Sequence, residues 1–153
     1  MHGVLVREAT VADAPALAPL LGELGYPADS AELTVRMERM LGRDDQKVLI
    51  AENDDGTLGL LALHVYPVLA YDRDLAMIMA LVVTERARCL GVGRQLVDRA
   101  EAVGRSLGAS RLMVTTHIRR ADAHAFYERL GFEFTGRRYV RAITPQRRNG
   151  ATD

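Results

Sequence analysis

The sequence predicts one domain built on a mixed α/β sheet, in which six to seven mostly antiparallel strands are flanked by about four helices. Three observations predict this architecture. Short apolar runs alternate with stretches of helical periodicity, a hairpin signal joins two runs in the first half, and a strand–helix–strand unit occupies the second half. A hairpin joins antiparallel strands, whereas the strand–helix–strand unit implies parallel neighbours with a right-handed crossover. We therefore expect helices on both faces of the sheet.

Two amphipathic helices are expected after a short first strand at residues 4–7. The first helix begins at Thr10, which has capping-box spacing to the acid three residues later. Leucines then recur at helical spacing as far as Gly25, which ends the helix. The second helix begins near residues 29–30, and Gly42 fits its C-terminal end.

Three strands follow, at residues 47–52, 57–66 and 75–83. Residues 54–56, Asp-Asp-Gly, predict a hairpin turn between the first two, because glycine accepts the positive φ that such turns need. Pro67 lacks a backbone donor and ends the second strand. The third strand is apolar at all nine positions, which is typical of a strand covered on both faces. A buried helix is the competing interpretation, but the short length favours a strand.

The second half repeats the alternation of helix and strand. Residues 92–107 show the clearest helical stripe, and a glycine follows as the stop signal. A strand is expected at 111–116, a short helix at 121–130, and one or two final strands within 132–143. Residues 144–153 are polar and offer nothing to bury, so we expect a disordered tail after a single domain at 1–143.

Composition excludes several classes of protein. The 153 residues include 20 basic and 20 acidic side chains, and the zero net charge disfavours a globally basic nucleic-acid binder. One cysteine, Cys89, permits no intramolecular disulfide and no multi-cysteine zinc module. The first residues lack the apolar stretch of a signal peptide, and the longest apolar run is far below the ~20 residues of a membrane span. We expect a cytoplasmic protein that contacts neither membrane nor nucleic acid.

The sharpest local feature is the loop Arg88-Cys89-Leu90-Gly91-Val92-Gly93-Arg94, between the apolar strand and the clearest helix. Two glycines allow tight turns and a close approach of the backbone to a ligand. The first N–H groups of a helix have no internal partner and carry the positive end of the dipole, which suits a pyrophosphate. A plain turn is the competing interpretation. A dinucleotide fingerprint needs a third glycine where Leu96 stands, and no Walker motif is present.

Two motifs in this order resemble the GNAT superfamily of N-acetyltransferases. LVVTERARCLGVGRQLV resembles its strand followed by [RQ]-x-x-G-x-[GA], and RADAHAFYERLGF, at 120–132, resembles its second motif N-x-x-A-x-x-F-Y-x-x-x-G-F. The N-terminal VREATVADAPALAPLL is similar to the usual start of such domains, so the resemblance covers residues 4–143. It implies a GNAT fold and acetyl transfer from acetyl-CoA to a primary amine by direct attack in a ternary complex.

The resemblance also implies a set of site residues and no metal. The strand before the loop would bind the pantetheine arm, and the loop amides would hold the pyrophosphate. The cofactor-binding residues that it implies are Leu81, Val82, Val83, Arg88, Leu90, Gly91, Val92, Gly93, Arg94, Arg120, Ala123, Phe126 and Arg129. Tyr127 would be the catalytic acid that protonates the departing thiolate, a role that suits a phenol of ordinary pKa near 10. A packed aromatic is the alternative for Tyr127. The amide around Val83 would polarise the thioester carbonyl.

The sequence departs from the family pattern at two places. Arg120 stands where the second motif has asparagine, and the strand before the loop carries no acid where relatives often have a glutamate base. The base is therefore not assigned by the resemblance. Five side chains or a water chain are candidates: His64, Asp72, Asp74, Glu85 and His117. For each histidine a hydrogen-bonded structural group is the competing interpretation.

The acceptor is not specified by the sequence. A small-molecule amine is the first hypothesis, because the short chain leaves little surface for a peptide. A protein or peptide N-acetyltransferase is the second. A non-catalytic acyl-CoA sensor is the third, and the missing strand acid motivates it. The resemblance also implies a homodimer as one assembly state.

Overall fold

The computed structural model describes residues 3–116 and 121–143. Its elements follow the predicted order closely, with small differences at their ends. In chain order they are β1 (Leu5–Glu8), the 3₁₀ turn η1 (Val11–Asp13), α1 (Ala14–Leu24), α2 (Ser30–Leu41), β2 (Gln46–Asn53), β3 (Gly56–Tyr66), β4 (Asp74–Val83), the 3₁₀ turn η2 (Glu85–Ala87), α3 (Val92–Ser106), β5 (Ala109–Val114) and α4 (Ala121–Arg129).

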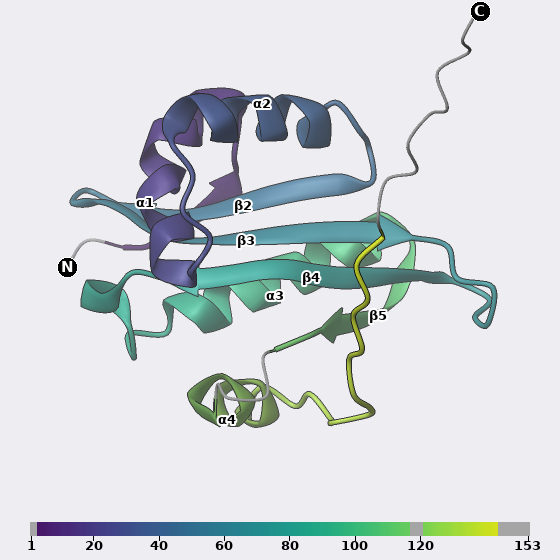
Figure 1. Ribbon diagram of the computed structural model, residues 1–153. Coiled ribbons are helices and arrows are strands. Elements are labelled where there is room, and N and C mark those ends of the chain that lie inside the picture. Colours follow the sequence, from purple (N-terminus) through teal and green to yellow (C-terminus); the bar gives the residue numbers. More distant parts are fainter. Residues whose placement is uncertain (1–2, 117–120, 144–153) are drawn as a thin grey trace, which may run out of the picture.

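The sheet has the strand order β1-β2-β3-β4-β5. Strands β1 to β4 form the predicted antiparallel meander, and β5 lies parallel to β4 after the crossover through α3. Figure 1 shows α1 and α2 on one face of the sheet and α3 on the other. The expected mixed, mostly antiparallel sheet with helices on both faces is confirmed.

The predicted number of strands was too high for the described residues. Five strands are present, and residues 132–143 form no strand. Phe132 packs partly buried against the core, but the large apolar side chains after it face solvent, with Phe134 82% and Tyr139 86% exposed. Figure 1 shows this segment crossing the strands rather than running beside β5. The alternating apolar residues predicted a strand, but a strand also needs a neighbouring edge, and this chain does not place the segment on one. The predicted tail at 144–153 lies outside the described residues.

Each face of the sheet has its own apolar core. Leu61, Leu63 and Ile78 pack with Leu96 and Val97 of α3 on one side. On the other side, side chains of α1 and α2 pack against the strands, and these are Leu17, Leu20, Leu33 and Met37 against Val48, Ile50, Leu60 and Val82. From residue 60 to residue 65 of β3, this period-two alternation sends odd positions to α3 and even positions to α1 and α2, whereas Leu58, at the irregularity before them, packs on the α3 side.

Local signals place the helix ends. The Asp29 carboxylate accepts a hydrogen bond from the Glu32 amide at 2.8 Å, which caps α2. Asp13 accepts from the Thr10 amide at 2.8 Å, so the predicted capping interaction is present. No helix in the described part of the chain is both long and apolar enough to cross a membrane.

One charged cluster joins three elements at the start of the chain. Arg7 on β1 donates to both carboxylate oxygens of Asp13 at 2.8 and 2.9 Å and to Glu52 on β2 at 2.7 Å. These hydrogen bonds from Arg7 lower the pKa of Asp13 below its usual value. The cluster therefore fixes the entry of the first helix against the edge of the sheet.

Candidate active site

Strand β4 has a free outer edge over its second half. Its pairing with β5 runs from Asp74 to Ile78 and ends there, whereas its pairing with β3 continues to Val83. Within the described residues, positions 79–83 therefore have β3 on one side and no paired strand on the other. A strand edge of this kind presents backbone donors and acceptors to a ligand.

A bulge marks the point where β5 leaves. Ala62 pairs with Ala80, but the next residue, Leu63, pairs with Ile78, so Met79 is the extra residue on β4. Met79 is 60% exposed, in the middle of the strand that the sequence predicted to be covered on both faces. That prediction was wrong at this position, because an apolar run does not reveal where a neighbouring strand ends.

The loop at residues 88–94, called the phosphate loop after the role that the sequence predicts for it, follows β4 and η2 and opens α3. Gly91 has a positive φ of 81°, and Cys89 also lies in the left-handed region at 62°. Gly91 is the N-cap residue and has no side chain to cap the helix, so the first amides of α3 lack an intrahelical partner. The side chains of Cys89 and Leu90 are exposed. The loop thus has the geometry of an anion site at a helix N-terminus.

Gly93 is required for packing rather than for a turn. A Cβ built on it would lie 2.9 Å from Cζ of Phe126 and 3.7 Å from Cγ2 of Val83. The end of β4, the first turn of α3 and the middle of α4 therefore meet at this glycine. The sequence did not reveal this contact, since the second glycine of G-x-G is the same in a loop that packs and a loop that binds.

Tyr127 lies on α4 within an aromatic cluster. Its ring makes edge contacts with Phe126 at 5.2 Å and with Phe132 at 5.5 Å between centroids. Edge-to-face contacts of this kind orient a ring. Phe126 packs on the core between α3 and the sheet, so Tyr127 is held next to the point where β4, α3 and α4 meet.

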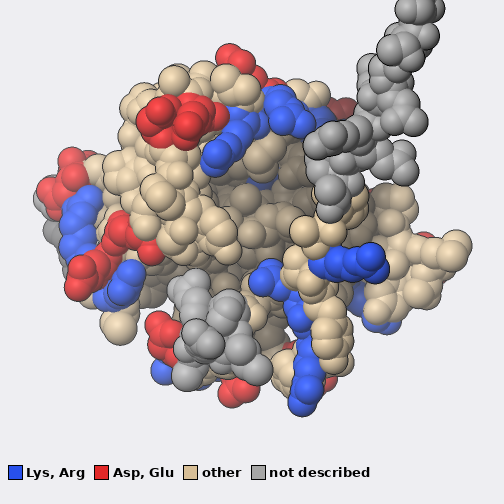
Figure 2. All heavy atoms as spheres, in the orientation of Figure 1, with Lys and Arg blue, Asp and Glu red and all other residues tan. Residues whose placement is uncertain are grey.

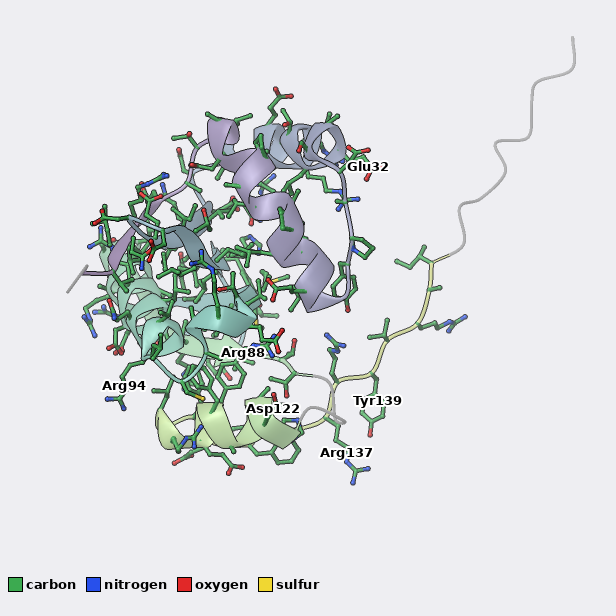
Figure 3. The ribbon with its side chains drawn as sticks, turned by 90° about the vertical axis from the view of Figure 1, so that its left-hand side faces the viewer. Glu32, Arg88, Arg94, Asp122, Arg137 and Tyr139 are labelled. Atoms are coloured by element: carbon green, nitrogen blue, oxygen red, sulfur yellow. The ribbon has the colours of Figure 1, made fainter. Side chains whose placement is uncertain are left out.

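The remaining cofactor residues predicted from the sequence fall into three groups. Val82 and Val92 are buried in the cores, so only their backbones can meet a ligand. Arg88 donates to the Val83 carbonyl at 3.4 Å, while Figure 3 shows Arg94 pointing away from α4. Ala123 is half-buried and Arg129 is exposed on α4, and Arg120 lies outside the described residues.

The candidate bases are scattered. Asp74 begins β4, at the end far from the loop, and Asp72 is exposed in the loop before it. Glu85 lies on η2, where its amide donates to Glu23 of α1 at 3.2 Å beside an open depression. His64 on β3 is part-buried and lies 3.3 Å from Asp45. His117 lies outside the described residues.

Comparison with known proteins bears directly on this site. The acetyltransferase (GNAT) family model matches residues 15–132, a span that contains α1, the free edge of β4, the phosphate loop and α4. This chain belongs to the GNAT acetyltransferase family. The expected resemblance and fold are thereby confirmed.

Two sequence relatives of this GNAT protein are acetyltransferases by name. One is the aminoalkylphosphonate N-acetyltransferase of Salmonella typhimurium, 32% identical over 94 residues, which cover 61% of each chain. The other is the amino-acid acetyltransferase of Azotobacter vinelandii, 34% identical over 132 residues, which cover 86% of this chain and 28% of the relative. The chain thus spans only part of the length of both.

Solved structures share the fold. The aminoglycoside N-acetyltransferase AAC(6')-Iy, in complex with CoA, superposes with a TM-score of 0.80 over 97% of each chain at 19% identity. At this identity the likeness shows the fold alone.

Proposed function

We propose that this GNAT protein transfers an acetyl group from acetyl-CoA to the primary amine of a small molecule, by direct attack of the amine in a ternary complex. The observation that carries the proposal is the free edge of β4 at residues 79–83, which is followed, after η2 and the glycine loop, by the N-terminus of α3. The pantetheine arm of CoA is extended and ends in a pyrophosphate. It therefore needs a strand edge for the arm, followed by an anion site for the pyrophosphate.

The edge of β4 suits the amide-rich pantetheine arm. Backbone groups of every second residue point to the same side of a strand. The Val83 carbonyl is reached by a side chain, Arg88, from outside the sheet, and Leu81 lies two residues before it. The arm would pair with Leu81 and Val83 as a short strand. Its thioester end, farthest from the phosphates, would then lie near the bulge at Met79.

The start of α3 suits the pyrophosphate. The amides of Val92, Gly93 and Arg94 point outward at the positive end of the helix dipole. Leu90 and Gly91 complete the turn, and Arg88 and Arg94 add positive charge near the anion. Phe126, Ala123 and Arg129 would contact the arm and the nucleotide from α4, with Arg120 before it.

The chemistry needs two proton transfers. The ammonium form of an alkylamine has no lone pair and must lose a proton before it attacks. After the C–N bond forms, the C–S bond breaks and the thiolate leaves, and Tyr127 is the proposed donor of its proton. No metal enters this mechanism. The amide of a β4 residue close to the thioester would stabilise the developing oxyanion.

The acceptor belongs on the face that carries α1 and α2. Figure 2 shows this face hollowed at its centre, with arginine and lysine side chains on the rim. Both named sequence relatives acetylate amines that are small molecules by their names, an aminoalkylphosphonate and an amino acid. Small amines of these two classes are therefore the first acceptors to test, and an aminoglycoside is the third.

The test compares two glycine variants of equal backbone strain. Gly91 and Gly108 both have positive φ, and at both a Cβ would meet nothing within 4 Å, but they flank opposite ends of α3. We expect Gly91→Glu to abolish CoA and acetyl-CoA binding in calorimetry, because its carboxylate repels the phosphates. Gly108→Glu should bind as the intact protein does.

Thiol release from acetyl-CoA in the presence of the amine panel tests the transfer itself. Release that depends on both the amine and an intact Gly91 supports the proposal. Tight CoA binding without transfer to any amine would instead identify an acyl-CoA sensor. Absence of CoA binding by the intact protein would refute both.

A further inference from the structure

Strand β3 carries, near its end, a histidine that lies beside a carboxylate. Positions 60 and 62 of β3 face α1 and α2, and His64 continues the same alternation beyond the helices. Its Nε2 lies 3.3 Å from Oδ2 of Asp45, and its ring lies against Tyr66 at 4.6 Å between centroids. The His64 side chain is 26% exposed, so it is supported by the protein and still open to solvent.

Asp45 is held by a side-chain ion pair and by a backbone hydrogen bond. Arg43 donates Nε to Oδ1 and Nη2 to Oδ2, both at 2.9 Å, in a bidentate pair. The Asp45 carbonyl accepts from the Val65 amide at 2.9 Å, which ties the loop to β3. Hydrogen bonds from Arg43 lower the pKa of Asp45 to about 2, so this group is a carboxylate at neutral pH.

The position of His64 relates it to the proposed thioester. Across the strands its partners are Gln46 on β2 and Met77 on β4, both uncharged. Met77 precedes the bulged Met79 by two residues, or about 7 Å along a strand. The arm on the outer edge of β4 adds the spacing from β3 to β4 and one further strand spacing, each about 5 Å, so an amine at the bulge would reach the imidazole through ordered water rather than directly. Asp45, with Arg43 behind it, is the charged group that contacts the ring in the described part of the chain.

We infer that His64 is the general base that takes a proton from the incoming ammonium group, and that Asp45 is its positioning residue. The inference rests on the proposed function. With Nε2–H donated to Asp45, Nδ1 carries the lone pair that accepts the proton. The neutral amine then attacks the thioester carbon. The amine loses its second proton as the C–S bond breaks, and this proton balances the one that the thiolate gains. His64 then returns to solvent the proton that it took from the ammonium group.

The experiment measures kcat/KM against pH with the panel amine that the intact protein turns over fastest. We expect His64→Gln to lose at least tenfold at neutral pH, as general base catalysis typically contributes a factor of a hundred or more. The fall in kcat/KM at low pH (the acid limb of the profile) should disappear, while the affinity for CoA stays within twofold. Asp45→Asn should lower kcat with little change in KM, because the imidazole loses the carboxylate that fixes its tautomer and orientation.

Glu101→Gln is the matched control, since it also breaks an exposed carboxylate–arginine pair, with Arg105 at 3.0 Å, but on the far side of α3. It should leave the profile unchanged. An unchanged acid limb in His64→Gln would overturn the inference, and so would an unchanged kcat in Asp45→Asn if the first variant does not fold. Failure of the proposed function can be told apart from failure of the inference alone, because the intact protein would then release no thiol with any amine. That outcome overturns the inference as well.

Discussion

At the scale of single residues, the two glycines of the phosphate loop have different physical roles. Gly91 supplies a left-handed backbone at the helix N-cap, where a side chain would be strained although nothing crowds it. Gly93 lies in ordinary helix, and its missing side chain makes room for Phe126. The G-x-G pattern predicts the first role from sequence. The second depends on which ring a distant helix brings to the loop, and no local pattern reports that.

This difference makes a prediction for Gly93→Ala. Its methyl group would meet the Phe126 ring at 2.9 Å, so that ring or α4 must shift, at a cost of about 1–3 kcal/mol in the free energy of unfolding. We expect a lower Tm and weaker CoA binding. Gly22→Ala is the control, since Gly22 lies inside α1 with nothing within 4 Å and should gain up to about 1 kcal/mol from helix propensity. Equal Tm values for the two variants would contradict the packing role of Gly93.

At the scale of elements, local signals predicted nearly every helix and strand. Apolar periodicity placed the cores, and capping residues and glycines placed the ends, as at Asp29 for α2. Two features could not be read in this way. The bulge at Met79 depends on where β5 stops pairing, and the absence of strands in 132–143 depends on whether an edge lies beside them. The bulge and the missing strands both depend on which strands lie beside the segment, rather than on the residues of the segment itself.

The cluster around Arg7 predicts a pH dependence at this scale. Asp13 has a lowered pKa in the folded state, so its contribution to stability is complete above the ordinary value of about 4 and is lost as pH falls through the folded pKa. We expect Asp13→Asn to cost about 1–2 kcal/mol at pH 7, because Arg7 and the Thr10 amide lose a carboxylate partner. Thermal melts from pH 7 to 2 should show the difference from the intact protein shrinking below about pH 4. A gap that is constant with pH would count against this electrostatic origin.

At the scale of the whole molecule, the described residues leave two complementary features unpartnered. One side of β5 pairs with β4, and the other side has no paired strand. Residues 132–143 expose Phe134, Tyr139, Val140 and Ile143, each at least 80%. Both features occur in every copy, so two copies can satisfy them reciprocally about a two-fold axis. We predict a homodimer in which this segment pairs with β5 of the second copy.

Light scattering during size-exclusion chromatography tests the dimer. The intact protein should elute with the mass of two chains, and Val140→Asp should shift it to one, because a charge would be buried against the strand edge. Leu69→Asp changes an equally exposed apolar residue of the loop before β4 and should not alter the mass. A monomer at every concentration tested would rule the dimer out.

The open edge of β4 has a consequence for how long the protein survives as well as for what it does. Residues 79–83 offer backbone groups that an extended ligand or a strand from another chain can pair with. If the cofactor arm pairs with this edge as proposed, a full cofactor pool would cover the edge, and a depleted pool would leave it open to side-by-side association and aggregation. The supply of acetyl-CoA would then determine how long this protein stays free of aggregation.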